Sequence, residues 1–377
     1  MNGVAIAVLF AASAAAVRYA VGLVLVWRYA RRGRLDRLPA GPTPPVTLLK
    51  PLYGAIDGLE GNLEATLRQN YPAFEVVFCH ERAEDPALEA ARAAAARTPD
   101  VDVSFLCGRA DGVANPKAAV LALGADAARH DLVAAADDDV APDPLYLRDL
   151  AAGLAEADAV SFPPVLVGAR TIPARLAALA VNTDGMLNVL FAHGRAMTGS
   201  TIGVRADALE RAGGWRAVGD RIADDYDLGK ALRAAGCTLG LARRPARLHS
   251  PGGGIGDTVA WMTRWARTIL HAAPGWFLLM AAGSLVAPAL IVVALATAHS
   301  GWAWGLLAVL TGLRAAIAIV VEVAFTRDMS MVRAIPLLPT LWLLEPWGVV
   351  RALLGRHVVW RGRRYRLERG RARLLDS

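Results

Sequence analysis

An apolar run at 132–136 is followed directly by three aspartates, Asp137, Asp138 and Asp139. Such a run predicts a buried strand in an α/β sheet, and ligands bind at the carboxyl ends of these strands. Asp137 and Asp139 stand two residues apart, so both carboxylates can face one hard cation. Mg²⁺ and Mn²⁺ prefer oxygen ligands and often share them with substrate phosphates. Taken alone, the three residues fit an exposed acidic turn equally well.

A second acidic pair, Asp224 and Asp225, precedes the helix-type apolar spacing of Leu228, Ala231 and Leu232. Two carboxylates can cap such a helix, and that structural interpretation stays open. Capping needs only one of them. The other can point into a ligand crevice and act as a general base.

Alternating strands and helices surround these acidic residues. We expect strands at 46–50, 75–79, 101–106 and 132–136, separated by helices at 59–68, 86–96 and 117–128. This order predicts an α/β fold with a mostly parallel sheet and right-handed crossovers. The residues after the first strand, 50–54, lack the glycine spacing of a dinucleotide-binding fold.

Three apolar stretches, 4–27, 277–298 and 302–325, are long enough to cross a hydrocarbon core of ~30 Å. The hydrophobic content of 55% is high for an ordinary soluble protein, and these stretches show that the apolar residues are clustered. A cleaved signal peptide fits the first stretch poorly, because its basic residues follow the apolar run. A fourth stretch, 334–350, is shorter and contains three prolines and Glu345, so we expect a broken, re-entrant or interfacial element.

Charged residues interrupt two of the long stretches. Arg18 must reach the membrane surface or lie against protein, and Arg314 and Glu322 are expected to offset each other inside a helix bundle.

Arginines follow the first apolar stretch and fill the C-terminal tail. They are Arg28, Arg31, Arg32, Arg34 and Arg37, and then Arg356, Arg361, Arg363, Arg364, Arg366, Arg369, Arg371 and Arg373. The positive-inside rule therefore places residues 28–276 and the tail in the cytoplasm. The net charge of +7 is assigned to contacts with anionic lipid headgroups. Because the arginines flank apolar segments, we expect no nucleic-acid partner.

The predicted domain organisation follows from these segments. It comprises an N-terminal transmembrane helix and basic linker (1–40), a cytoplasmic catalytic domain (41–250), a mobile loop with an interfacial helix (251–276), C-terminal membrane helices (277–355) and a basic cytoplasmic tail (356–377). The three cysteines are widely spaced and make neither a disulfide framework nor a zinc site.

Eight short motifs run in order along nearly the whole chain. They are 49–54, 85–87, 115–117, Asp137, 197–200, 224–226, the Arg264–Trp265 pair and 360–367. Together they resemble the membrane-bound, processive-type branch of glycosyltransferase family two. The resemblance is greatest to its ceramide glucosyltransferase group, whose bacterial relatives include glycosyltransferases of hopanoid synthesis.

The resemblance implies a GT-A-type nucleotide-sugar-binding domain in a multi-pass protein of a bacterial-type inner membrane. It implies an inverting transfer of a hexose, from a donor such as UDP-glucose, to a lipid hydroxyl such as that of ceramide. A UDP-N-acetylglucosamine-dependent glycosylation of a hopanoid polyol is the alternative. A polysaccharide synthase would need more membrane spans, and a non-catalytic scaffold or transporter has no need for four carboxylates in one cleft.

The resemblance also implies roles for individual residues. Asp225 is the catalytic base with Asp224 beside it, and Asp137 and Asp139 hold Mg²⁺ or Mn²⁺. The donor-binding positions are Lys50, Asp85, Lys117, Asp137, Arg264 and Trp265. The last motif departs from the family pattern, because Trp261 stands where Gln or Arg is usual.

The acceptor is expected to reach the site along an amphipathic stretch at 170–192, which can lie in the headgroup layer. His193 follows that stretch. It is a candidate contact for the acceptor hydroxyl, and a simple interfacial histidine is the alternative.

Overall fold

The computed structural model describes residues 3–33, 41–54, 56–250, 252–296, 301–360, 363–368 and 370–375. The chain divides into two compact units, which we describe separately. The sheet unit comprises Gly33–Val165, Ala192–His249 and His357–Ser377, and the helix unit comprises Met1–Arg32, Leu166–Phe191 and Ser250–Arg356. The expectations for Arg34, Arg37, Arg361 and Arg369 fall outside the described residues.

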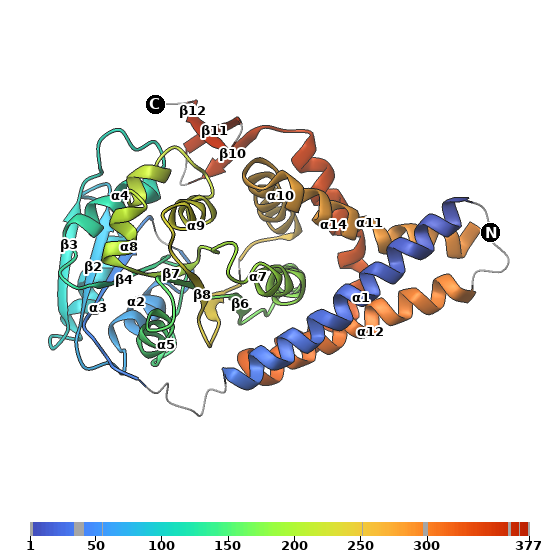
Figure 1. Cartoon of the computed structure of the whole chain (residues 1–377), viewed down its shortest axis with the longest axis horizontal. Coiled ribbons are helices and arrows are strands. Elements are labelled where there is room, and N and C mark those ends of the chain that lie inside the picture. Colours follow the sequence, from blue (N-terminus) through green and yellow to red (C-terminus); the bar gives the residue numbers. More distant parts are fainter. Residues whose placement is uncertain are drawn as a thin grey trace. The chain divides into compact units, whose positions relative to one another are not determined.

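A seven-stranded sheet, in the order β3-β2-β1-β4-β7-β5-β8, forms the centre of the sheet unit. Strands β1 to β4 are parallel to one another, whereas β7 runs antiparallel to both β4 and β5. Figure 1 shows α4 and α8 on one face of this sheet and α2, α3 and α5 on the other. The predicted mostly parallel α/β sheet is confirmed. Strand order reverses between β1 and β4, and such switch points open a ligand crevice.

The four strands and three helices predicted between residues 46 and 136 agree with the observed bounds to within two residues, whereas the other elements of the sheet unit had no predicted range. The strands of the main sheet are β1 (Val46–Pro51), β2 (Phe74–His80), β3 (Asp102–Cys107), β4 (Leu132–Ala136), β5 (Ala159–Ser161), β7 (Thr201–Arg205) and β8 (Leu239–Leu241). Two short strands are β6 (Pro164–Val167) and β9 (Ala246–His249). The helices are α2 (Leu59–Leu67), α3 (Pro86–Ala96), α4 (Pro116–Asp126), α5 (Tyr146–Leu154), α8 (Ala206–Arg211), a 3₁₀ turn (Trp215–Val218) and α9 (Asp224–Ala234).

Local chemistry sets where the site-bearing helices begin. Asp85 and Asn115 are the N-caps of α3 and α4, and each accepts a hydrogen bond from a backbone N–H of its first turn. Each cap is followed by a proline, which is favoured at the first helical position. On the face of the sheet that α4 covers, the buried side chain of Trp215 packs in one core with apolar residues of β1, β2 and β4.

The C-terminal tail forms a small antiparallel sheet in the same unit. Its strands are β10 (His357–Trp360), β11 (Arg363–Glu368) and β12 (Arg371–Leu374). Tyr365 is buried within it, and the Arg363 guanidinium lies 2.8 Å from the Glu81 carboxylate beyond β2. The described residues of the tail from His357 onward therefore belong to the sheet unit and pack against it.

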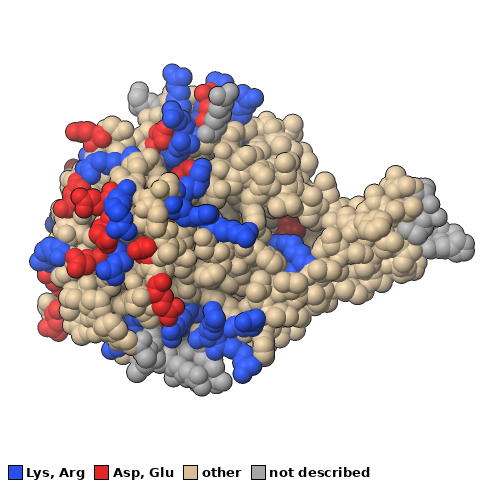
Figure 2. Space-filling view, in the orientation of Figure 1, with Lys and Arg blue, Asp and Glu red and all other residues tan. Residues whose placement is uncertain are grey.

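The helix unit is built around three long apolar helices. They are α1 (Gly3–Arg32), α11 (Pro274–Ala296) and α12 (Gly301–Val321). By length and composition all three can cross a membrane. Figure 1 shows α1 and α12 side by side, and they pack along their lengths. In Figure 2 the surface of these helices is almost free of charged side chains, which gather instead over the elements of the sheet unit.

Shorter helices complete the helix unit. They are α6 (Ile172–Ala180), a π-helical segment (Val181–Gly185), α7 (Met186–Phe191), α10 (Ile255–Ala272), a second π-helical segment (Glu322–Thr326), α13 (Ser330–Ala334), a 3₁₀ turn (Ile335–Leu337) and α14 (Leu338–Leu353). The stretch 334–350 is thus divided at a proline-containing turn. Along α14, Leu343, Trp347 and Val350 expose an apolar stripe at helical spacing.

Two sequence expectations were wrong. Arg314 does not pair with Glu322, because the second π-helical segment turns the Glu322 carboxylate toward the start of α13. There it accepts hydrogen bonds from the backbone N–H groups of Met329 and Met331, at 2.8 and 3.0 Å. Cys107, which strand position predicts to be buried like Cys79, is exposed at the end of β3.

We predict that Lys50→Met destabilises the sheet unit. Lys50 is fully buried in β1, and its ammonium donates hydrogen bonds to the carbonyl oxygens of Asp137 at 2.6 Å and Val140 at 3.0 Å. A methionine fills the space but leaves both acceptors unpaired, so the free energy of unfolding should fall by about 1–3 kcal/mol. Thermal unfolding in detergent measures it. Lys230→Met, at an exposed lysine, should leave the melting temperature unchanged; equal melting temperatures for both variants would contradict the prediction.

Candidate active site

The acidic turn Asp137–Asp139 lies at the carboxyl end of β4, beside the switch point. Backbone contacts hold it: the Asp137 N–H donates to the Ser200 carbonyl oxygen at 2.9 Å, and the Asn62 amide donates to the Asp138 carbonyl oxygen at 2.9 Å. Together with the hydrogen bonds that Lys50 donates, these contacts hold the main chain of the turn in place. These contacts use the backbone of the turn and leave the carboxylates of Asp137 and Asp139 for other partners.

Lys117 brings the two predicted acidic motifs together. Its side chain is buried at the start of α4, and its ammonium lies 2.8 Å from Asp137 Oδ1 and 3.5 Å from Asp224 Oδ2. The third donor goes to the Gly199 carbonyl oxygen at 3.2 Å. A lysine among carboxylates in a dry site keeps its proton. Burial and these contacts show that Lys117 is not a solvated lysine at the start of its helix.

Asp224 and Asp225 occupy the first turn of α9. Asp224 is buried and paired with Lys117. Asp225 is half-buried and lies against Gly199, where an added Cβ atom would be 2.4 Å from the Asp225 Oδ2 atom. The Asp224 carboxylate is thus held by the Lys117 ammonium, whereas the Asp225 carboxylate lies against Gly199, which has no side chain.

Burial and mutual repulsion change the acidity of these groups. Burial, and then the charges of Asp137 and Asp138, raise the pKa of Asp139 to about 7. Burial, and then the charge of Asp224, raise the pKa of Asp225 to about 7, against the opposing effect of Lys117. Carboxyl groups with such pKa values can exchange protons near neutral pH.

The two buried lysines respond in opposite directions. Burial lowers the pKa of Lys50 to about 8, although the neighbouring aspartates oppose the shift. Burial also disfavours the charged form of Lys117, but the carboxylates of Asp137 and Asp224 outweigh it and raise its pKa. Lys117 is therefore the permanent cation of the site.

The acidic turn is suited to a divalent cation. Asp139 Oδ1 is buried and has no hydrogen-bond partner among the described residues. Such an orphaned carboxylate oxygen, next to Asp137, matches the one or two carboxylates with which proteins usually hold Mg²⁺. No group of three or more His, Cys, Asp or Glu residues gathers around a common point in the described part of the chain. A cation at the turn would take its other ligands from water or a bound diphosphate.

Four other residues were predicted to bind the donor or the acceptor. Asp85 is buried at the start of α3, and its carboxylate also accepts a hydrogen bond from the Gly54 N–H beyond β1, at 2.8 Å. His193 is exposed after α7. Arg264 and Trp265 belong to α10 in the helix unit, where the Trp265 ring packs on Trp261 with centroids 5.0 Å apart. The site roles assigned to these residues stay predictions.

The sequence reasoning missed the polar groups of the segment 197–200. The hydroxyl groups of Thr198 and Ser200 are buried without a hydrogen-bond partner among the described residues. They flank Gly199, which contacts both Lys117 and Asp225. The available signal was position, because this segment directly precedes β7, the neighbour of β4.

The acidic site lies at the edge of a mostly parallel α/β sheet, and the same chain carries three long apolar helices. The family model described as glycosyl transferase family 21 matches residues 7–373, and the chain belongs to that family. The predicted ceramide glucosyltransferase-like group is confirmed, although the family is twenty-one and not, in the strict sense, family two.

Curated relatives are ceramide glucosyltransferases. Ceramide glucosyltransferase 1 of Caenorhabditis elegans is 26% identical over 56% of this chain and 47% of its own length. The ceramide glucosyltransferase of Komagataella phaffii is 34% identical over 26% of this chain and 21% of its own length. The chain thus spans about half, or less, of the curated relatives it matches. Among solved structures, the mannosyltransferase PcManGT from Pyrobaculum calidifontis covers 92% of this chain and 99% of its own, at 19% identity and a TM-score of 0.49.

We predict that Gly199→Ala impairs activity more than folding. The new methyl group must displace the Asp225 carboxylate, and a shift of about 1 Å in a catalytic group lowers turnover by up to ~10²-fold. The matched control is Gly61→Ala in α2, where an added Cβ meets nothing within 4 Å. The turnover number of each variant, measured beside its melting temperature, tests this. Equal turnover in Gly199→Ala and wild type would show that the close approach has no role.

Proposed function

We propose that the chain is an inverting glycosyltransferase that moves a hexose, from UDP-glucose, to the hydroxyl of a membrane lipid such as ceramide. The observation that carries the proposal is the convergence of Asp137, Lys117 and Asp224, from three distant parts of the chain, at the carboxyl edge of the sheet. Membership of family 21 and the three long apolar helices support a lipid acceptor.

Asp225 is the proposed base. An alcohol is a weak nucleophile at neutral pH, so a carboxylate must take its proton as the oxygen attacks the anomeric carbon. Asp224 is held by Lys117 and is the poorer candidate. A single displacement with one base inverts the anomeric centre, whereas retention needs a second carboxylate as nucleophile.

Asp137 and Asp139 are proposed to hold Mg²⁺ or Mn²⁺. When bound, the cation would neutralise the negative charge on the departing nucleoside diphosphate. Lys117, fixed beside Asp137, adds a second positive charge on the same side of the crevice. Arg264 and Trp265 are proposed to contact the same diphosphate, Asp85 the uridine and His193 the acceptor. Lys50 contributes by supporting the acidic turn.

The membrane arrangement is also a proposal. Arg31 and Arg32 form the last turn of α1 and favour the cytoplasmic side for that end of the helix. The sheet unit would then face the cytoplasm, where nucleotide sugars are made.

Mass spectrometry of the lipids formed by the purified chain, supplied with each nucleotide sugar and each acceptor, tests donor and acceptor together. Absence of any glycosylated lipid would refute the proposal.

We predict that Asp225→Asn lowers transfer by ~10²-fold or more, because the amide keeps the shape of the carboxylate but cannot accept a proton. Binding of UDP, measured by calorimetry, should persist.

In the wild type, kcat/KM should rise with pH through about 7 and then level off. The base works only when ionised, and kcat/KM reports the free enzyme, in which the Asp225 pKa is about 7. A flat profile between pH 5.5 and 8 would assign the base elsewhere.

We predict that chelation stops transfer, that Mg²⁺ or Mn²⁺ restores it, and that Asp139→Ala raises the cation concentration needed for half-maximal activity. The substitution removes the orphaned oxygen but not the Asp137–Lys117 contact, so folding should be preserved. Asp143→Ala is the control, since Asp143 lies beyond the turn and contacts Arg244. Full activity of the wild type in excess chelator would exclude a cation at the acidic turn.

A further inference from the structure

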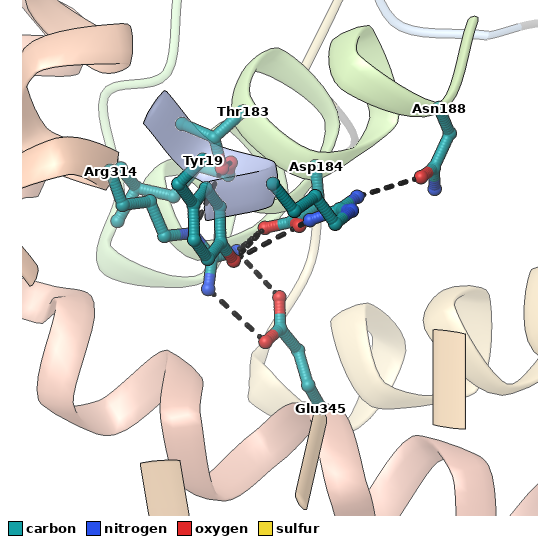
Figure 3. Close-up of polar contacts among 8 residues, drawn as sticks. Tyr19, Thr183, Asp184, Asn188, Arg314 and Glu345 are labelled. Atoms are coloured by element: carbon teal, nitrogen blue, oxygen red, sulfur yellow. Dashed lines mark hydrogen bonds and ion pairs between the residues drawn. The ribbon is translucent and has the colours of Figure 1, made fainter. Parts of the chain in front are cut away.

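A cluster of charged and polar side chains lies inside the helix unit, where apolar contacts would be expected (Figure 3). It joins five elements of the unit. Its members are Arg18 and Tyr19 of α1, Thr183 and Asp184 of the first π-helical segment, Asn188 of α7, Arg314 of α12 and Glu345 of α14. π-Helical turns are frequent at functional sites, and this one directs two members of the cluster inward.

Arg314 is the structural centre of the cluster. It is fully buried, and each terminal nitrogen has a partner. Two hydrogen bonds run to Glu345, at 2.6 and 3.2 Å, and an ion pair to Asp184 Oδ2, at 2.8 Å. Its Nε donates to the Thr183 hydroxyl at 3.0 Å. These contacts use four of the five N–H donors of the guanidinium, and its full burial closes it to a ligand.

Arg18 is different. Its side chain is 36% exposed, and it donates to Asp184 Oδ1 at 2.8 Å and to Asn188 Oδ1 at 2.9 Å. The Tyr19 and Phe191 rings lie 5.3 and 5.9 Å from its guanidinium carbon. Among the described residues, its Nε–H and the second hydrogen of each terminal nitrogen have no partner. The Asn188 side-chain N–H₂ group has none there either.

Arg18 is placed at a depth that a lipid head can reach. It lies about 22 Å along α1 from Gly3, and Arg314 lies about 20 Å along α12 from Gly301. In a hydrocarbon core of ~30 Å, both are about 10 Å from the far boundary. That boundary is on the side of the sheet unit in the proposed topology. An exposed guanidinium at this depth is costly unless an oxygen atom of a ligand meets it.

The charges of the cluster determine which kind of lipid head group can bind at its open edge. Two arginines face two carboxylates, so an added phosphate would leave an unbalanced anion in a low dielectric. The open edge offers donors on Arg18 and Asn188 beside an acceptor on Asp184, which is 23% exposed. A hydroxyl or an amide, which both donates and accepts, matches that edge without adding charge.

We propose that Arg18 and Asn188 bind the uncharged, hydroxyl- or amide-bearing head of the lipid acceptor within the helix unit. The inference rests on the proposed function, because it assigns a site to the acceptor of that reaction. It makes Arg18 a specificity-determining residue: lipids with a small neutral head bind, and lipids with a phosphate head are rejected by the balanced cluster.

The test uses the full chain in nanodiscs of phosphatidylcholine and a fluorescent short-chain ceramide as the probe. Arg18→Met should raise the Kd of the probe by about tenfold or more, the loss expected for a hydrogen bond from a charged donor. The KM for N-hexanoylsphingosine should rise in parallel, and the KM for UDP-glucose should not change. Arg31→Met, at the end of the same helix, is the matched control and should leave both values unchanged.

Arg18→Lys separates binding from folding. Lysine keeps a positive charge beside Asp184, so the melting temperature should stay near that of the wild type even if Arg18→Met unfolds. It lacks the planar set of donors, so probe binding should still weaken. Wild-type Kd and KM values for the lipid in Arg18→Lys and in Asn188→Leu would overturn the inference.

Three further outcomes are decisive. If the Arg18 variants differ from wild type only when phosphatidylglycerol is added to the nanodisc, Arg18 binds a lipid phosphate and the inference is wrong. If the probe binds in an Arg18-dependent manner but no sugar is transferred, the proposed function fails while the lipid site stands. If sugar is transferred and lipid binding ignores Arg18, only the inference fails.

Discussion

The contact of the Lys117 ammonium with Asp137 and Asp224 is the interaction on which the sheet unit's site depends. Without a cation between them, carboxylates from β4 and α9 could not share a buried edge, because each would bear the full repulsion of the other. One lysine does not balance them all. The surplus negative charge raises the pKa of Asp139 and Asp225 to about 7. A divalent cation relieves the same surplus, so the folded site is prepared for one before the donor's diphosphate adds further negative charge.

The buried charges of the helix unit, unlike those of the sheet unit, are balanced. Its buried cluster matches Arg18 and Arg314 with Asp184 and Glu345, so no net charge remains inside an apolar surrounding. Removing one partner of such a set is far more costly than never having buried it. Balanced charge therefore fixes how α1, α12 and α14 meet, whereas unbalanced charge in the sheet unit leaves a site that recruits an ion. Both clusters combine basic and acidic side chains, and they differ in whether the opposite charges are balanced.

Local patterns predicted most of the fold. The strand and helix ranges, the three long apolar helices and the position of Asp137 all followed from periodicity, caps and apolar length, which act between near neighbours. The partners of Arg314 did not. A helical repeat tells which face a residue occupies but not which distant segment covers that face, so the nearby Glu322 was chosen over Asp184. The same limit hid Thr198 and Ser200, whose role depends on β7 lying beside β4.

The topology explains why the recognisable motifs are short and far apart. At the switch point, the ends of β1 and β4, the segment before β7 and the starts of α4 and α9 all reach one edge of the sheet. Only these chain ends need particular side chains, and the segments between them need only be apolar on the correct face. Membership of family 21 across residues 7–373 is thus compatible with 26% identity to a curated relative. The chemistry is fixed at a few points, and the scaffold that carries them is free to vary.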